Sequence, residues 1–580
     1  MPDFVIGESD FLLYGRPFRI LSGALHYFRV HPRSWADRIE KARLMGLNTI
    51  ETYVPWNTHS PRRGVFDTEG MLDLEGFLRQ VAEAGLYAIV RPGPYICGEW
   101  DNGGLPAWLF QEPGVGIRRH EKRFLAAVEE YLEHVLRIVR PLQVDRGGPV
   151  LLVQVENEYG AFGDDQPYLK ALVEIIRQAG ITVPLVTVDQ PADGMLAAGG
   201  LDGVLRTGSF GSRSVERLRT LRAHQPSGPL MCMEFWDGWF DQWGGPHHTT
   251  GVEETAAELD TLLAAGASVN VYMFHGGTNF GLTNGANDKG VYRPTVTSYD
   301  YDAPLDEAGN PTPKYHAFRE VISRYAPVPA ETAHPTAPAP EQRVALGEPI
   351  RLLAHPDRWG VWSRHESMPS LDDLGARLAL FRTTIDVEGA ALLTVGEVRD
   401  RAMVFLDGDP VGVLDREHHD RAIMLPRGRG RLEIVVEDQG RVNYGPRIGE
   451  PKGLIGPVRL GSEPLLDWSA CAIDLDGVPQ LWESGRTDGP GVGPTAWRAS
   501  FEAAEPADHF LHTETWGKGL AWVNGFCLGR YWRRGPQHTL FVPGPVVRAG
   551  RNELVVLELD VMADPTARFG PSASLGHLEL

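Results

Sequence analysis

The chain has 580 residues, of which 42% are hydrophobic and 23% charged, and its formal net charge at pH 7 is −20. This length predicts two to four domains, because one hydrophobic core rarely extends past roughly 250–300 residues. The acidic balance disfavours nucleic acid and anionic membranes as partners, since both attract basic surfaces. No stretch has the pattern of a membrane span or a signal peptide, so we expect an intracellular, cytoplasmic protein.

The first 325 residues alternate between short apolar runs and segments with helical periodicity. The apolar runs predict strands at 18–25, 48–54, 87–93, 150–156, 184–189, 203–209, 229–235 and 269–275. Helical stretches such as Trp35–Met45 and Lys122–Arg140 lie between most of them, and several end in a C-capping glycine. Eight strand–helix units predict a (β/α)8 barrel over residues 1–325. The alternative is a doubly wound sheet, but no glycine-rich loop follows the first strand.

The composition changes after residue 325. A Pro/Ala-rich stretch at 326–342 predicts an extended linker, and short strands with turn glycines follow it. Segment Arg401–Arg416 resembles Leu520–Arg533, since each reads as two strands joined by an Asp-Gly or Asn-Gly turn. The repeat predicts two β-sandwich or jelly-roll domains, at 343–475 and 476–580, with residues 349–364 fitting either one.

Acidic residues follow several of the predicted strands. The segment "GGPVLLVQVENEYG" begins as a buried strand and ends with Glu156 and Glu158. Ionised carboxylates are costly to bury, so solvated loop residues would be the ordinary interpretation of these acids. At a barrel mouth, however, they would stand where barrel enzymes place reacting groups. Glu234 follows the seventh strand and Glu99 the third, which favours the second interpretation.

Carboxylates that face each other across a barrel mouth suit glycoside hydrolysis. One carboxyl protonates the leaving oxygen, and the second attacks or stabilises the anomeric carbon. Aromatic rings at the same strand ends suit the apolar faces of sugars, although each ring alone fits packing better. These are Trp56, Tyr95, Trp100, Trp108, Trp236, Trp239, Trp243, Tyr299 and Tyr301. The adjacent His247 and His248 lack the spacing of a metal site, so no metal is expected.

Several long segments resemble glycoside hydrolase family 35, the β-galactosidases in which β-domains follow a barrel. The segments are "LSGALHYFRV", "GLNTIETYVPWN", "RPGPYICGEWDNGGLPAWL", "GGPVLLVQVENEYG", "MFHGGTNFG" and "TSYDYDAPLDEAG". The resemblance covers nearly all of residues 10–325. It continues more weakly through "VNYGPRIGEPKGLIG" and the last β-domain.

The resemblance implies a retaining exo-β-galactosidase that needs no cofactor. It assigns the general acid/base to Glu158 and the nucleophile to Glu234, and it places Asn157 at the sugar 2-hydroxyl. The other substrate-binding positions are Tyr53, Cys97, Gly98, Glu99, Trp236 and Tyr301. Many family members carry a tyrosine where this chain has Trp236, so this position has no phenol to donate to the nucleophile.

Strand alternation would put Glu156 on the same side as Glu158. We interpret Glu156 as a structural acid paired with a buried arginine such as Arg91. The expected partner is a small-molecule or oligosaccharide β-galactoside, and a homo-oligomer is compatible with the sequence. The alternatives are a β-glucosidase or β-mannosidase and a non-catalytic carbohydrate-binding protein; the presence of both Glu158 and Glu234 opposes the last.

Overall fold

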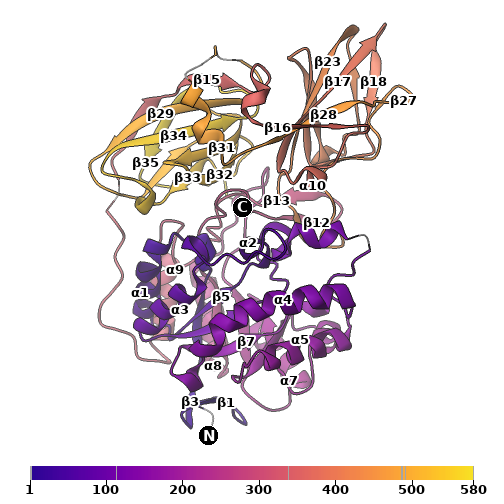
Figure 1. Ribbon diagram of the computed structural model, residues 1–580. Coiled ribbons are helices and arrows are strands. Elements are labelled where there is room, and N and C mark those ends of the chain that lie inside the picture. Colours follow the sequence, from indigo (N-terminus) through magenta and orange to yellow (C-terminus); the bar gives the residue numbers. More distant parts are fainter. Residues whose placement is uncertain (1–2, 113, 338, 485–487, 490, 579–580) are drawn as a thin grey trace.

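The N-terminal part of the computed structural model is a closed barrel of eight parallel strands (Figure 1), in the order β10-β11-β4-β5-β6-β7-β8-β9. The structure describes residues 3–112, 114–337, 339–484, 488–489 and 491–578. The barrel strands are β4 (Leu21–Leu25), β5 (Thr49–Tyr53), β6 (Tyr87–Arg91), β7 (Val150–Gln154), β8 (Leu185–Asp189), β9 (Leu205–Ser209), β10 (Met231–Trp236) and β11 (Ser268–His275). All eight predicted strands are therefore confirmed.

Helices surround the barrel and cover its outer face. They are α1 (Trp35–Met45), α3 (Leu74–Glu83), α4 (Lys122–Val139), α5 (Gln166–Gln178), α6 (Asp193–Gly199), α7 (Ser214–His224), α8 (Val252–Ala264) and α9 (Pro313–Ile322). Helix α4 buries Phe124, Val128 and Leu132 at helical spacing, and each such side chain contributes about 1.5–3 kcal/mol. Gly46 ends α1 in the left-handed conformation that favours glycine (φ 99°). Among the described residues, every helix is too short or too polar to span a lipid bilayer.

A small antiparallel sheet precedes the barrel. It consists of β1 (Phe4–Ile6), β2 (Phe11–Leu13) and β3 (Arg16–Phe18). The ring of Phe18 packs edge-on against Tyr87 at the start of β6, with 5.5 Å between the ring centroids. The sheet thus lies at the end of the barrel where the strands begin, opposite the end where reacting groups are expected.

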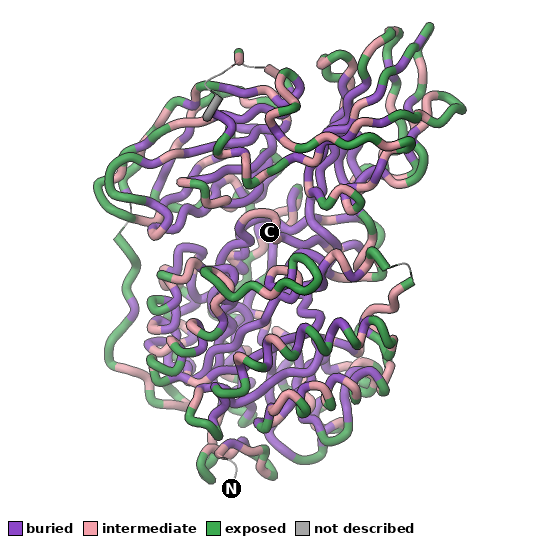
Figure 2. Tube along the Cα trace, viewed as in Figure 1, coloured by how far each residue is buried: buried purple, intermediate pink, exposed green. Residues whose placement is uncertain are grey.

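Two antiparallel β-domains follow the barrel (Figure 1), and each encloses its own core between two sheets (Figure 2). The first contains β16 (Gly360–His365), β17 (Leu378–Val387), β18 (Ala391–Thr394), β20 (Arg401–Leu406), β21 (Asp409–Asp415), β22 (Ala422–Leu425), β23 (Gly428–Glu437), β26 (Arg459–Leu460), β27 (Glu463–Pro464) and β28 (Trp468–Ile473), with α10 (Leu371–Leu374) and the pair β19 (Glu397–Arg399) and β25 (Gly453–Ile455). The last contains β14 (Gln342–Ala345), β15 (Gly347–Arg351), β29 (Thr495–Ala503), β30 (His509–His512), β31 (Lys518–Val523), β32 (Phe526–Trp532), β33 (Thr539–Val542), β34 (Gly550–Glu558) and β35 (Thr566–Gly570). The two domains also share a buried cluster that includes Leu380 and Leu557.

Both predicted hairpins are present. Strands β20 and β21 pair around Asp407-Gly408, and β31 and β32 pair around Asn524-Gly525. All four turn residues have positive φ, between 50° and 87°. A two-residue hairpin turn of this kind matches the twist of the strands and selects the Asp-Gly and Asn-Gly sequences.

The structure differs from the expected domain ranges just after the linker. Strand β14 pairs with β35, and β15 pairs with β29, so residues 342–351 belong to the sheets of the last domain. Strand β16, in contrast, pairs with β28 of the first all-β domain. The chain thus begins the last domain, builds the first one, and then returns. A short strand's sequence defines its faces but not its hydrogen-bonding partner.

A small mixed sheet connects the barrel to the first all-β domain. Strand β12 (Ala286–Asp288), in the loop after β11, pairs with β13 (Tyr292–Pro294) and, in parallel, with β24 (Val442–Tyr444) of the β-domain. Nearby, Arg377 donates two hydrogen bonds to the Asp101 carboxylate, at 2.9 and 2.8 Å. These contacts hold residues 442–448 beside the mouth of the barrel.

Candidate active site

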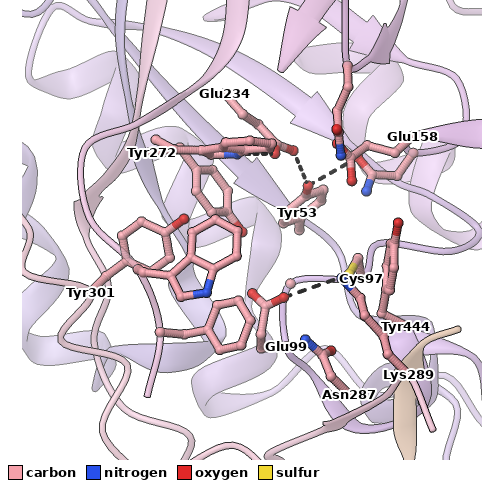
Figure 3. A pocket seen from close by; sticks show the side chains of 16 residues that line it. Tyr53, Cys97, Glu99, Glu158, Glu234, Tyr272, Asn287, Lys289, Tyr301 and Tyr444 are labelled. Carbon is pink, nitrogen blue, oxygen red and sulfur yellow. Dashed lines mark hydrogen bonds between the residues drawn. The ribbon is translucent and has the colours of Figure 1, made fainter. Parts of the chain in front are cut away.

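A pocket of about 110 Å³ opens where the barrel strands end (Figure 3). All nine of the site residues predicted from the sequence line it: Tyr53, Cys97, Gly98, Glu99, Asn157, Glu158, Glu234, Trp236 and Tyr301. The structure therefore brings together residues from five barrel strands or the loops that follow them. What each side chain can do depends on its hydrogen bonds and its charge environment.

Glu234, near the end of β10, is surrounded by donors. Its Oε1 accepts hydrogen bonds from a guanidinium N–H of Arg91 and from the Tyr53 hydroxyl, the latter at 2.8 Å (Figure 3). Its Oε2 accepts from Ser209 Oγ at 2.9 Å and from the indole N–H of Trp236 at 3.1 Å. Burial alone would raise the pKa of Glu234, but the charge of Arg91 and these hydrogen bonds lower it below the ordinary value. Glu234 is thus held as a carboxylate.

Trp236 takes the place of the missing phenol as a hydrogen-bond donor. Trp236 has no phenol, but its indole nitrogen is a hydrogen-bond donor of fixed direction. That nitrogen lies 3.1 Å from Glu234 Oε2, so the tryptophan supplies the hydrogen bond that the sequence comparison left open.

Glu158 has the opposite electrostatic character. It follows β7 in the left-handed backbone conformation, with φ of 43°, which costs a residue other than glycine about 1–2 kcal/mol. Its Oε1 is buried and has no hydrogen-bond partner among the described residues. The pKa of Glu158 is raised to about 7, mainly by burial and secondly by the negative charge of Glu234. Two carboxyls whose environments push their pKa values apart are suited to act as an acid and a nucleophile.

Glu156 is a structural acid, as expected, but its partner is Arg118 and not Arg91. Arg118 donates from Nε to one carboxylate oxygen at 3.1 Å and from a terminal nitrogen to the other at 2.8 Å. Strand β7 ends at Gln154, and Glu156 has φ of 60°, so strand alternation no longer applies there. The expectation that Glu156 and Glu158 share a side is therefore wrong: only Glu158 lines the pocket.

Arg91 lies beneath the pocket and is fully buried. Besides Glu234, it donates to Asn157 Oδ1 at 2.6 Å and lies 3.6 Å from Glu51 Oε1. Burial raises the pKa of Glu51 to about 7, against the opposing charge of Arg91. The Tyr53 hydroxyl, whose single proton goes to Glu234, also lies 3.1 Å from Asn157 Oδ1 (Figure 3). One arginine thereby orients both the candidate nucleophile and the candidate sugar-binding amide.

The wall formed by Cys97, Gly98 and Glu99 is a tight loop. All three residues have positive φ, between 48° and 55°. In Cys97 and Glu99, which are not glycines, this conformation is strained; such strain is tolerated where the surroundings fix the backbone, and it clusters at functional sites. Here Arg29 donates to the Gly98 carbonyl, and the Tyr299 hydroxyl donates to the Glu99 carboxylate. Burial raises the pKa of Glu99 to about 7.

Six further residues line the pocket that the sequence did not single out: Gln190, Phe240, Tyr272, Asn287, Lys289 and Tyr444. Tyr444 comes from the first all-β domain. The neighbouring Asn443 donates to Asn287 Oδ1 at 3.1 Å and lies 3.5 Å from the Cys97 sulfur. The family resemblance continues through the segment "VNYGPRIGEPKGLIG", which contains Tyr444. This was the one sequence feature that could have indicated that the first all-β domain contributes a residue to the pocket.

The candidate aromatic residues divide between the pocket and the core. Trp236, Trp239 and Tyr301 line the pocket, and Trp239 is 40% exposed there. Trp56 is buried and stacks on Tyr131, at 4.8 Å between ring centroids, so it serves packing.

Known proteins match this chain over nearly its whole length. The family model described as glycosyl hydrolases family 35 matches residues 10–325. Two further models, named beta-galactosidase, first all-beta domain, and beta-galactosidase, galactose-binding domain, match residues 373–474 and 494–552. The chain is 40% identical to beta-galactosidase-1-like protein 2 of Homo sapiens over 588 residues, covering 98% of this chain and 91% of that protein. It is 39% identical to the beta-galactosidase of Xanthomonas manihotis over 560 residues, covering 93% and 91%. Together with the barrel and its pair of carboxyls, these matches show that the chain belongs to glycosyl hydrolases family 35.

Proposed function

We propose that the protein is a retaining exo-β-galactosidase, which removes terminal β-D-galactose from the non-reducing ends of β-galactosides. The observation that carries the proposal is that Glu158 and Glu234 line one pocket and have pKa values shifted in opposite directions. The names of the relatives support galactose as the sugar. The small volume of the pocket, about 110 Å³, favours a single terminal sugar.

The reaction proceeds in two steps, and Glu158 and Glu234 act in both. In the first, a Glu234 oxygen bonds to the anomeric carbon while Glu158 gives its proton to the departing glycosidic oxygen. In the second, Glu158, now ionised, takes a proton from water, whose oxygen displaces Glu234 from the anomeric carbon. The donors from Arg91 and Tyr53 fix the direction in which Glu234 points. No cofactor takes part in either step.

A panel of nitrophenyl glycosides, followed by proton NMR of the first product, tests the proposal. We expect the β-galactoside to be cleaved faster than the β-glucoside or β-mannoside. Two successive displacements at one carbon preserve its configuration, so β-galactose should appear before its α-anomer. Early α-galactose would contradict the two-step mechanism, and faster release of another sugar would contradict the assigned specificity.

The pH dependence of kcat/KM should be bell-shaped. At low pH, protonation of Glu234 removes the nucleophile, and this limb should fall below the ordinary pKa of a glutamate. At high pH, loss of the Glu158 proton removes the acid, and this limb should fall near the pKa of about 7. In a Glu158→Gln variant the high-pH limb should disappear when an aryl galactoside is the substrate. If that limb persists, another group donates the proton.

A further inference from the structure

Arg530 lies in β32, the edge strand of one sheet of the last β-domain, and it is 3% exposed. Within the described residues, every hydrogen bond and ion pair of its side chain reaches another domain. One terminal nitrogen donates to Asn284 Oδ1, in the barrel loop after β11, at 2.5 Å. The other donates to the main-chain carbonyl of Asp438 in the first all-β domain, and Nε lies 3.6 Å from Glu437 Oε1. Arg530 therefore joins three domains at one buried point.

A guanidinium is well suited to form such a junction. Its donors lie in one plane and point in fixed directions, so the acceptors on its two terminal nitrogens are held at a fixed separation. Both acceptors are buried, since Asn284 is 1% exposed and Asp438 is fully buried. Without the arginine, a buried carbonyl group on each of two domains would lose this donor.

On the barrel side, Asn284 is connected to one wall of the sugar pocket. It forms an antiparallel bridge with Trp100. The next residue, Gly285, donates its N–H to the carbonyl of Glu99 at 2.7 Å, and Glu99 lines the pocket. The position of Asn284 therefore affects where this wall lies.

On the side of the first all-β domain, the same asparagine is connected to a second wall. Its amide nitrogen donates to the Gln439 carbonyl at 2.9 Å. A β-carbon on Gly440, the next residue, would lie 2.7 Å from that amide nitrogen, so the chain passes directly against Asn284. This segment continues to Tyr444, which lines the pocket.

The two walls meet at Gly285 in dense packing. A β-carbon on Gly285 would lie 2.5 Å from Asn443 Oδ1 and 2.6 Å from the Trp100 carbonyl oxygen, both closer than non-bonded atoms approach. These two residues are chain neighbours of the pocket residues in the two walls. Because close-packed interiors transmit small shifts, a displacement of Asn284 should move both walls.

We propose that Arg530 is a positioning residue for galactoside binding, which holds the walls that contain Glu99 and Tyr444 at the separation that fits the sugar. The inference rests on the proposed function, and it gives the last β-domain a part in that function. Among the described residues, Arg530 is not one of those that line the pocket with Glu158 and Glu234. Its loss should therefore weaken sugar binding without changing the chemical step.

Replacing Arg530 by methionine in the full-length protein tests the proposal. KM for nitrophenyl galactoside and the inhibition constant of galactose should rise about 2–30-fold, the usual effect of a residue that acts on a site through its neighbours. The value of kcat should stay within about twofold, because an interaction made equally with substrate and transition state affects KM alone. Both limbs of the pH profile should stay in place. Arg530→Lys keeps the charge but lacks the planar pair of donors, so KM should rise there too.

The matched control is Arg401→Met. Arg401 is 5% exposed and joins the same two β-domains through Asp560, at 2.6 Å, and neither side chain bonds to the barrel within the described residues. This variant should lower the melting temperature to a similar degree and leave KM unchanged. Asn284→Ala removes the acceptor on the barrel and should raise KM as Arg530→Met does. The effects of the two substitutions should not add in the double variant, because both break one contact.

The failure of the inference can be distinguished from the failure of the proposed function. Unchanged KM and galactose inhibition in Arg530→Met would overturn the inference, and so would a fall in kcat alone or a displaced pH limb. A wild type that neither releases galactose nor is inhibited by it would overturn the proposed function instead.

Amide hydrogen exchange tests the positioning role without turnover. Exchange in residues 97–101 and 439–444 should become faster in Arg530→Met but not in Arg401→Met. Equal exchange in the two variants would contradict the role. If Arg530→Met does not fold, Arg530→Lys and Asn284→Ala carry the same predictions.

Discussion

Replacing Glu158 by alanine is expected to lower kcat/KM for lactose about 10²–10⁴-fold, the usual contribution of general acid catalysis. With a dinitrophenyl galactoside, the rate of the first step should fall far less, because the dinitrophenolate leaves without needing a proton. The galactosyl-enzyme would then accumulate, since no base activates water in the second step. Azide needs no base, so it should restore turnover and yield β-galactosyl azide, which steady-state kinetics and product analysis would detect.

Two neighbouring acids provide the controls. Glu234→Ala removes the nucleophile, so it should abolish turnover of both substrates. Glu156→Ala removes an acid two residues from Glu158 that pairs with Arg118 and lies outside the pocket, so azide should not affect it. An azide response in Glu156→Ala would show that the acid of the "ENE" triplet had been assigned wrongly. Equal losses on both substrates in Glu158→Ala would exclude it as the proton donor.

Replacing Arg91 by methionine is expected to lower the free energy of unfolding by about 3–5 kcal/mol, the typical effect of removing one partner from a buried ion pair. Arg91 is fully buried between Glu51 and Glu234, which would lose their nearest cation. The pKa of Glu234 should therefore rise, and the low-pH limb of kcat/KM should move to higher pH. Urea unfolding measures the first effect and the pH profile of kcat/KM the second.

Arg118→Met is the matched control for this second prediction, because it leaves another buried carboxylate, Glu156, without its arginine. It should destabilise the fold to a similar degree without moving the low-pH limb. Arg91→Lys retains the charge and should displace that limb less than Arg91→Met does. A low-pH limb that stays in place in Arg91→Met would show that other groups keep Glu234 ionised.

The barrel was predictable from the sequence because its parallel strands are buried on both faces. Strands such as β7 and β8 therefore appear as short continuous apolar runs, and helices with glycine caps separate them. The hairpin turns were predictable because Asp-Gly and Asn-Gly pairs readily adopt the positive φ that a two-residue hairpin turn requires, as Asp407-Gly408 and Asn524-Gly525 do. The partners of β14 and β15 were not, since each pairs with a strand far along the chain.

In the candidate site, too, some residues could be predicted from the sequence and others could not. Glu158 and Glu234 could be located because barrel enzymes place reacting groups after their strands, because Glu158 falls in a family-like segment, and because the resemblance assigns the nucleophile to Glu234 after the seventh strand. The partner of Glu156 could not, since a single residue with φ of 60° reverses the direction of its side chain. The role of Arg91 could not be predicted from the sequence either, because its partners Glu51 and Glu234 lie on other strands and are reached through the barrel interior.

The contact between Asn443 and Cys97 also sets the order of events during synthesis, because 346 residues separate the two side chains. At a translation rate of about 5–20 residues per second, a ribosome needs roughly 17–70 s to make the chain between them. The barrel strands have all been made before Asn443 emerges, whereas β14 must wait still longer for β35. The wall of the barrel mouth that Tyr444 supplies is therefore missing until the first all-β domain has been synthesised.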